Sequence, residues 1–185
     1  ERPKHLVTFT YGIWVFETPV TQALWTKFDS EYEPRFVGDQ HPVEGITWTE
    51  SVTFCNTLSQ YLGRSDMYKV ADKGVHATLE KGTGFRLPFE SEWEYFARAG
   101  TYRKLQKYPG DGALNELGWY NQNSSGETHP VGIKKPNEWG LFDLSGQVWE
   151  WCHDIWSKES YRLRDESTPH PVNLTARVGP RVIRG

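Results

Sequence analysis

The sequence is poor in cysteine and methionine and has no long apolar run. Its 185 residues include two cysteines, and these form no Cys-x-x-Cys motif. The six histidines likewise form no closely spaced pair, so a zinc site is not expected. No apolar stretch approaches the roughly 20 residues of a membrane span, and the charged start has no apolar signal-peptide core. We therefore expect no membrane span, and the compartment cannot be read from the sequence.

An excess of positive charge is also missing. The formal net charge is −3, whereas a protein that binds nucleic acid through its phosphates needs a basic face. We therefore expect a protein, peptide or small-ligand partner and no nucleic acid. Aromatic residues are abundant, at 15% of the chain. Most should fill the core of one domain with little regular structure, and the rest could line a binding surface.

Residues 137–154 form the most informative stretch. Glycines alternate there with tryptophans and acids in a pattern that fits neither a helix nor a strand. The carboxylates of Asp143 and Glu150 flank Gly146, and such oxygen donors in a tight turn suit calcium, which also accepts carbonyl oxygens. The alternative is that both acids only cap turns and accept hydrogen bonds from buried amides.

Local signals predict a fold of the α+β class in which less than half of the chain is regular structure. Alternating β-favouring residues predict a strand over 6–16. Thr18-Pro19 predicts the start of a helix over 19–28. A capping box at Thr47-Trp-Thr-Glu50 begins a second main helix over 48–62, and Gly63 ends it.

Shorter elements are predicted further along the chain. These are a strand over 68–71, a third helix over 90–99 and a strand over 177–184, with an irregular region over 100–136. Arg86 could form a buried pair with Glu92 or Glu94, or all three charges could be solvated. We expect Cys55 and Cys152 to be buried structural thiols. Asn123 and Asn173 fit glycosylation acceptor patterns, which often arise by chance.

Three segments carry a resemblance to a known family. They are 41–55 (His-Pro-Val-Glu-Gly-Ile-Thr-Trp-Thr-Glu-Ser-Val-Thr-Phe-Cys), 84–95 (Gly-Phe-Arg-Leu-Pro-Phe-Glu-Ser-Glu-Trp-Glu-Tyr) and 137–151 (Asn-Glu-Trp-Gly-Leu-Phe-Asp-Leu-Ser-Gly-Gln-Val-Trp-Glu-Trp). In this order they resemble the motifs of the formylglycine-generating enzymes, also called sulfatase-modifying factors. The sequence departs from the family at Phe89, where a threonine usually supplies the hydroxyl that caps the next helix.

The resemblance implies a fold and a metal site. The fold is the variant C-type-lectin-like one, with a small twisted sheet, two main helices and long irregular loops. The implied structural calcium ion is bound by the side chains of Asp143 and Glu150 and the carbonyls of Gly146 and Val148. The resemblance extends over roughly 6–185, so we expect one such domain over 1–185 that lacks the part after the family's Arg-Gly-Gly motif.

The resemblance also implies two alternative functions. The enzymes of the family are copper-dependent oxidases whose reactive cysteine pair follows that Arg-Gly-Gly motif, and Cys55 and Cys152 occupy other positions. We therefore expect a non-catalytic ligand- or protein-binding domain. The alternative is a fragment of a formylglycine-generating oxidase, with copper bound by cysteines beyond residue 185. The binding surface implied by the family lies over the core-motif loops, where four aromatic residues are contact candidates unless they are buried: Trp119, Tyr120, Trp139 and Trp156.

Overall fold

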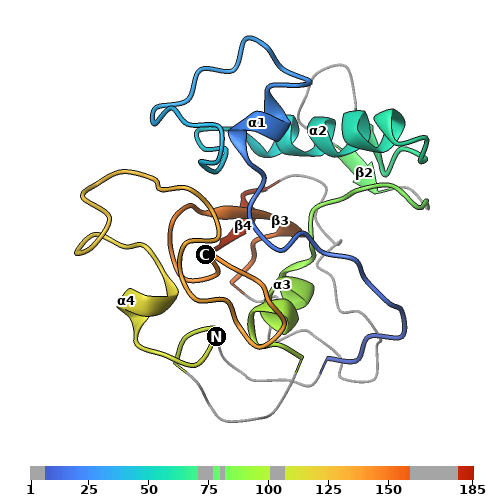
Figure 1. The fold of residues 1–185 in the computed structure, drawn as a ribbon. Coiled ribbons are helices and arrows are strands. Elements are labelled where there is room, and N and C mark those ends of the chain that lie inside the picture. Colours follow the sequence, from blue (N-terminus) through green and yellow to red (C-terminus); the bar gives the residue numbers. More distant parts are fainter. Residues whose placement is uncertain (1–6, 71–76, 80–81, 101–106, 159–178) are drawn as a thin grey trace. The chain divides into compact units, whose positions relative to one another are not determined.

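The computed structural model describes residues 7–70, 77–79, 82–100, 107–158 and 179–185 (Figure 1). The chain folds as two compact units. Unit 1 comprises Glu1–Val15, Ser51–Trp93 and Trp151–Arg184, and unit 2 comprises Phe16–Glu50, Glu94–Glu150 and Gly185. The helices of the described residues are α1 Gln22–Trp25, α2 Trp48–Tyr61, α3 Glu90–Ala97 and α4 Leu114–Leu117. The strands are β1 Tyr68–Val70, β2 Ala77–Leu79, β3 Glu150–Ile155 and β4 Arg181–Arg184.

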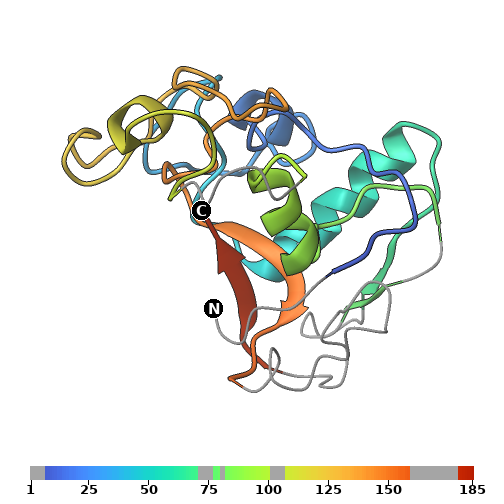
Figure 2. The ribbon, with the colours of Figure 1, turned by 90° about the horizontal axis from the view of Figure 1, so that it is seen from below.

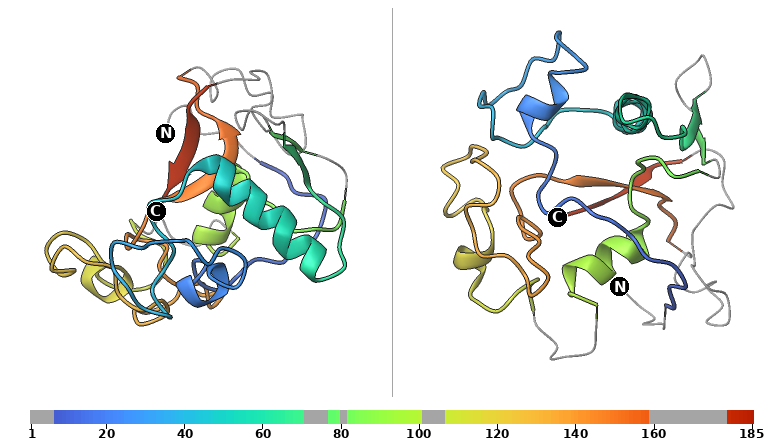
Figure 3. Two further views of the ribbon diagram at one scale, coloured as in Figure 1. Left: turned by 90° about the horizontal axis from the view of Figure 1, so that it is seen from above. Right: turned by 45° about the vertical axis from the view of Figure 1, so that its right-hand side comes forward.

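The helix α2 confirms the prediction for 48–62 (Figure 3). At its start the Thr47 hydroxyl accepts the Glu50 N–H at 3.2 Å, and the Glu50 carboxylate accepts the Thr47 N–H at 2.6 Å. This is the reciprocal capping box that the sequence predicts. At its end Gly63 adopts φ +67°, and the Arg64 N–H donates to the Ser59 carbonyl at 2.8 Å. A left-handed residue at this position is the usual helix stop.

The predicted helix over 19–28 is wrong over most of its length. The helix α1 has four residues, and Thr21, not Thr18, caps it by accepting the Leu24 N–H. Beyond α1 the Asp29 carboxylate accepts the indole N–H of Trp25 at 3.2 Å and the N–H of Glu31 at 3.2 Å. Such side-chain bonds offer the backbone an alternative to further helical turns.

The strand predicted over 6–16 is also wrong, because the described part of it, residues 7–16, forms no strand. A side-chain contact holds this segment within unit 1. The Tyr11 hydroxyl donates to a carboxylate oxygen of Glu92 at 2.6 Å. Most described residues of the segment are nevertheless exposed, and Trp14 is fully so. Its β-favouring composition therefore indicates neither strand pairing nor burial.

The helix α3 starts without a hydroxyl cap at Phe89, and a distant residue replaces it. The carboxylate of Asp154, in β3, accepts the Glu90 N–H at 2.7 Å, and that of Glu92 accepts the Phe89 N–H at 2.7 Å. A carboxylate at a helix N-terminus satisfies otherwise orphan donors and typically stabilises by about 1 kcal/mol. Within unit 1, Asp154 therefore caps α3 in place of Phe89, whose side chain has no hydrogen-bonding group.

The strands form two small sheets. In one, β1 pairs antiparallel with β2, and Lys69 lies opposite Thr78. In the other, β3 and β4 run side by side (Figure 2), and the Trp156 N–H continues the pairing with the Pro180 carbonyl at 2.7 Å. The predicted strands over 68–71 and 177–184 are confirmed within the described residues. These sheets, together with α2, α3 and the long loops, confirm the predicted α+β class.

Each unit has its own apolar core. In unit 1 the buried apolar residues are Val52, Phe54, Cys55, Leu58, Met67, Tyr68, Phe89, Trp93, Cys152, Ile155 and Val182. In unit 2 they are Trp25, Val43, Trp48, Phe96, Ala97, Leu117 and Leu141. In α2, Val52, Cys55 and Leu58 share one buried face, whereas Leu62, just after the helix, is 52% exposed. None of the described helices is long and apolar enough to cross a membrane.

A buried ion pair confirms one of the two pairings considered for Arg86. Its guanidinium donates to both carboxylate oxygens of Glu92, each at 2.7 Å. Glu92 is 0% exposed. Burial would raise the pKa of Glu92, but the hydrogen bond to Arg86 and its charge lower that pKa overall. Glu94 pairs instead with Arg98, one helical turn away.

Candidate functional site

The core-motif loop, residues 137–150, is held in unit 2 by its first residue. Asn137 is buried, and its amide donates to the Phe96 carbonyl at 2.7 Å. The same side chain accepts the N–H groups of Trp139 at 3.0 Å and Leu141 at 3.1 Å. One buried amide therefore fixes both the end of α3 and the first turn of the loop.

The centre of the loop contains an unusual run of left-handed backbone. Asp143 and Gln147 have φ +58° and +67°, and Gly146 has φ +107°. A Cβ at Gly146 would lie 2.0 Å from the Trp119 carbonyl oxygen, so only glycine fits. Non-glycine residues at positive φ cost free energy and persist where their surroundings hold them. This loop is therefore a preformed turn.

Asp143 is the most unusual side chain of the turn. It is 1% exposed, and its Oδ2 accepts the Gly132 N–H at 2.8 Å. Its Oδ1 is buried and has no hydrogen-bond partner. Burial raises the pKa of Asp143, and the hydrogen bond from Gly132 offsets this only in part. A buried carboxylate oxygen without a donor costs free energy, and a bound cation would remove that cost.

The other predicted calcium ligands lie in the same unit. The Gly146 carbonyl accepts the Val148 N–H at 2.9 Å, and its oxygen has a second lone pair that could bind an ion. Glu150 is half-buried at the start of β3. Among the residues that the structure describes, no three His, Cys, Asp or Glu side chains cluster. The donor set consists of two carboxylates and two carbonyls, which fits calcium chemistry. Binding itself remains a prediction.

Trp119 lies beside this turn and is half-buried. Its ring stacks on His129 with centroids 3.8 Å apart, and the Lys134 ammonium lies 3.8 Å from the ring centroid. Its carbonyl accepts the Gln147 N–H at 2.9 Å. Tyr120 is half-buried. The first two contact candidates therefore lie largely within the packing of unit 2.

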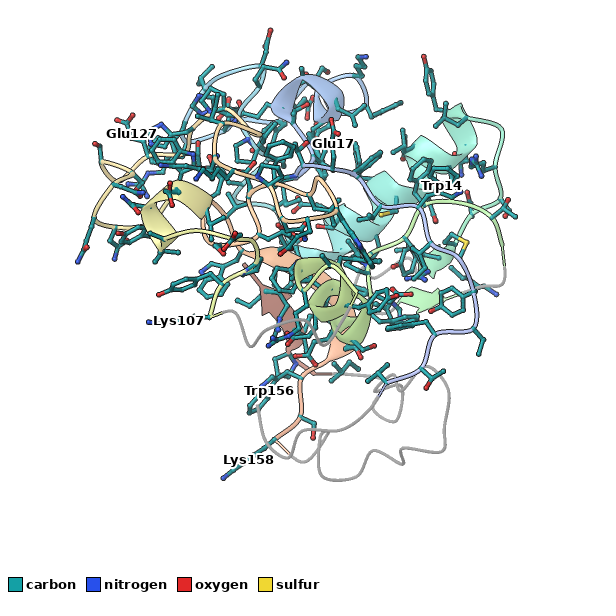
Figure 4. The ribbon with its side chains drawn as sticks, turned by 60° about the horizontal axis from the view of Figure 1, so that its bottom comes forward. Trp14, Glu17, Lys107, Glu127, Trp156 and Lys158 are labelled. Atoms are coloured by element: carbon teal, nitrogen blue, oxygen red, sulfur yellow. The ribbon has the colours of Figure 1, made fainter. Side chains whose placement is uncertain are left out.

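The other two candidates are more exposed. Trp139 is 47% exposed and packs edge-on against Tyr95, with centroids 5.2 Å apart. Trp156 follows β3 in unit 1 and is exposed (Figure 4), so it belongs to a different unit from the other three. Sequence reasoning missed Trp149, which is 70% exposed. Trp149 lies just before β3, between Val148 and Glu150, which are both half-buried. Neighbouring residues in an extended chain point to opposite faces, and this rule could have revealed its exposure.

The side chain of one glycosylation candidate takes part in a turn. The side chain of Asn123 accepts the Tyr120 N–H at 2.7 Å, and its amide nitrogen donates to the Gly118 carbonyl at 3.0 Å. A glycan would replace one of the two hydrogens on that nitrogen and leave the other to donate. Asn173 lies outside the described residues.

The two cysteines do not fit a copper site. Cys55 in α2 and Cys152 in β3 are both buried in unit 1, as predicted. Burial raises the pKa of the Cys55 thiol to about 12. A thiol with such a pKa stays protonated near neutral pH, and the thiolate is the form that binds copper.

Comparison with known proteins settles the family. Residues 1–185 match the sulfatase-modifying factor enzyme 1-like domain. The chain belongs to this family. It is 34% identical over 159 residues to the formylglycine-generating enzyme of Streptomyces coelicolor, covering 78% of this chain and 41% of that protein. It is 29% identical over 180 residues to the chaperone protein LppX of Paenibacillus barcinonensis, covering 80% of this chain and 63% of that protein.

Solved structures of this family's fold agree with the architecture. The Treponema denticola variable protein 1 matches with a TM-score of 0.70 and 30% identity, over 91% of this chain and 70% of that chain. CarF matches with a TM-score of 0.57 and 22% identity, over 91% of this chain and 84% of that chain, which shows the fold alone. The sulfatase-modifying-factor domain described here spans about two fifths to two thirds of the curated relatives named above.

Proposed function

We propose that this sulfatase-modifying-factor domain is a non-catalytic module that binds a polypeptide through its core-motif loop. The observation that carries the proposal is the exposure of two tryptophans of that loop. Trp139 is 47% and Trp149 is 70% exposed, and they lie on either side of the buried Asp143 in sequence. Exposed tryptophans are frequent anchors of protein interfaces, because they bury a large apolar area with little loss of side-chain freedom.

The rigidity of the loop supports binding. The Gln147 amide accepts the His129 N–H at 3.1 Å and donates to the His129 carbonyl, and Asn137 fixes the other end of the loop. A surface whose backbone is already ordered loses less conformational entropy when a partner binds. The 29% identical relative is named a chaperone protein, which supports a polypeptide as the partner class.

A calcium ion belongs to the same proposal. The carboxylates of Asp143 and Glu150 with the carbonyls of Gly146 and Val148 would hold it. The ion would compensate the buried Asp143 oxygen and so stabilise the turn that carries both tryptophans. Its role would be structural.

The second candidate is a fragment of a copper-dependent oxidase, and the 34% identity to a formylglycine-generating enzyme favours it. In that reading the copper-binding cysteines lie outside these 185 residues, because neither buried thiol fits the role. The core-motif loop would then help to hold the peptide that is oxidised.

Peptides selected against the domain test the binding proposal. Random peptides displayed on phage are selected on the immobilised domain, and the enriched peptides are titrated by fluorescence polarisation. We expect the double variant Trp139→Ser/Trp149→Ser to weaken binding about tenfold or more. The matched control is Trp14→Ser, which removes a fully exposed tryptophan in unit 1 and should leave affinity unchanged. Failure to enrich any peptide, or an equal loss in the control, contradicts the proposal.

A further inference from the structure

Unit 2 contains an open cavity that none of the core-motif residues line. It follows α1, has a volume of about 570 Å³ and is bounded by Trp25, Tyr32 and the loops that lead into α2. Ligand sites commonly have volumes of about 300–1,000 Å³. The cavity is therefore large enough for an organic group.

Aromatic side chains form one wall, and hydrogen bonds fix it. The rings of Trp25 and Tyr32 have centroids 5.9 Å apart. The Tyr32 hydroxyl donates to the Glu44 carbonyl and accepts the Glu44 N–H, both at 2.9 Å. The Asp29 carboxylate holds the Trp25 indole at 3.2 Å. The wall is thus formed before any ligand arrives.

The cavity carries a strong excess of negative charge. Its lining includes the carboxylates of Asp29, Glu31, Glu33, Glu44 and Glu50 and one guanidinium, that of Arg35, which leaves a net charge of −4. The Arg35 guanidinium lies over the Phe36 ring, 5.0 Å from its centroid.

Two of these carboxylates are available for a ligand. Asp29, Glu44 and Glu50 accept backbone N–H groups and so hold the loop. Glu31 and Glu33 are exposed, and the described residues donate no hydrogen bond to either side chain. These two charges therefore remain free to attract a cation.

The arrangement favours an organic cation over a metal ion. Three of the five carboxylates already accept backbone N–H groups, and within the described ranges no three acidic, histidine or cysteine side chains form a cluster. The carboxylates are therefore spread around the cavity, whereas a calcium ion needs several oxygen atoms at 2.3–2.6 Å. Ammonium and guanidinium groups combine well with aromatic faces and dispersed carboxylates.

We propose that this cavity binds an ammonium or guanidinium group carried on an aliphatic chain. The aliphatic part would lie against the half-buried Tyr32, which packs on the buried Trp25, and the charged end would face Glu31 and Glu33. The group could be a lysine or arginine side chain of a polypeptide, or a free diamine. The inference does not depend on the proposed core-motif surface, because the two sites share no residue.

Calorimetry with defined probes tests the inference and distinguishes a polypeptide side chain from a free diamine. The probes are acetyl-Gly-Lys-Gly-amide, acetyl-Gly-Arg-Gly-amide and 1,5-diaminopentane, with acetyl-Gly-Leu-Gly-amide as the uncharged comparison. We expect a cationic probe to bind and the leucine peptide not to bind. Preference for the two cationic peptides identifies a polypeptide side chain, and equal or tighter binding of the diamine identifies a free amine.

Charge variants show where the probe binds. Glu31→Gln/Glu33→Gln removes two negative charges at the cavity and should weaken the cationic probe about fivefold. The matched control, Asp111→Asn/Glu127→Gln, removes two exposed negative charges elsewhere in unit 2 and should change affinity less than twofold. Glu127 is labelled in Figure 4. The inference is overturned if no cationic probe binds at millimolar concentration, or if both double variants weaken binding equally.

Discussion

Replacement of Arg86 by leucine should lower the free energy of unfolding by about 3–5 kcal/mol, the loss typical when one partner of a buried ion pair is removed. The Arg86 guanidinium forms two hydrogen bonds of 2.7 Å with the Glu92 carboxylate. Glu92 is 0% exposed, so the variant would leave a buried negative charge. The Tyr11 hydroxyl and the Phe89 N–H would remain as its donors, and neither neutralises the charge.

Urea denaturation followed by circular dichroism measures this loss. The matched control is Arg98→Leu, which breaks the Arg98–Glu94 pair, whose side chains are 56% and 32% exposed. Exposed pairs of this kind contribute about 0.3–0.5 kcal/mol. The double variant Arg86→Leu/Glu92→Leu should recover part of the loss, because it removes the stranded charge as well. Equal losses for Arg86→Leu and Arg98→Leu would show that the buried pair does not organise unit 1.

The same pair predicts a pH dependence. The pKa of Glu92 is lower in the folded protein than its ordinary value. The ionised Glu92 therefore contributes its full stabilisation above the ordinary glutamate pKa of about 4.3. This stabilisation is lost as the pH falls through the lower pKa that Glu92 has in the folded protein. Stability of the unaltered protein should decline in this acidic range, and the decline should be smaller in Arg86→Leu.

Calcium added to chelated protein should raise the free energy of unfolding by about 2.7 kcal/mol at a hundredfold excess over the dissociation constant. The buried Asp143 Oδ1 without a donor is the physical reason, because an ion that binds only the folded state compensates that atom only there. Differential scanning calorimetry with and without calcium measures the rise in melting temperature.

Variants assign the calcium effect to residues. Asp143→Ala and Glu150→Ala should abolish the rise, whereas Glu127→Gln, which changes an exposed acid of the same unit, should retain it. The readout is the difference caused by calcium, since Asp143→Ala also removes the acceptor of the Gly132 N–H. If chelated and calcium-loaded proteins melt together and elemental analysis finds no calcium, Asp143 and Glu150 only cap turns.

Local signals were sufficient for part of the fold. The capping box of Thr47 and Glu50 and the stop at Gly63 lie within a few residues of the backbone they control, so α2 could be predicted with its ends. The cap of α3 could not, because Asp154 lies 64 residues from Glu90 in the chain. The predicted helix over 19–28 failed at its start, because the backbone of residues 20–23 bonds to residues 39–43, far along the chain.

The site was predictable to a similar degree. The family motif identified Asp143, which is buried, and Gly146. Both have positive φ angles and form the centre of the turn. It could not indicate that Trp119 stacks between His129 and Lys134. Those contacts form because the chain after Trp119 folds back onto its ring, and no short sequence motif predicts this.

A peptide-oxidation assay tests the claim of a non-catalytic domain most directly. The chain is incubated with copper, oxygen and a sulfatase-type cysteine peptide, and the mass of the peptide is followed. Because Cys55 and Cys152 are both buried and burial raises the pKa of Cys55 to about 12, we expect the peptide thiol to persist at the rate of a control without protein. Conversion of that thiol to an aldehyde with repeated turnover would contradict the account.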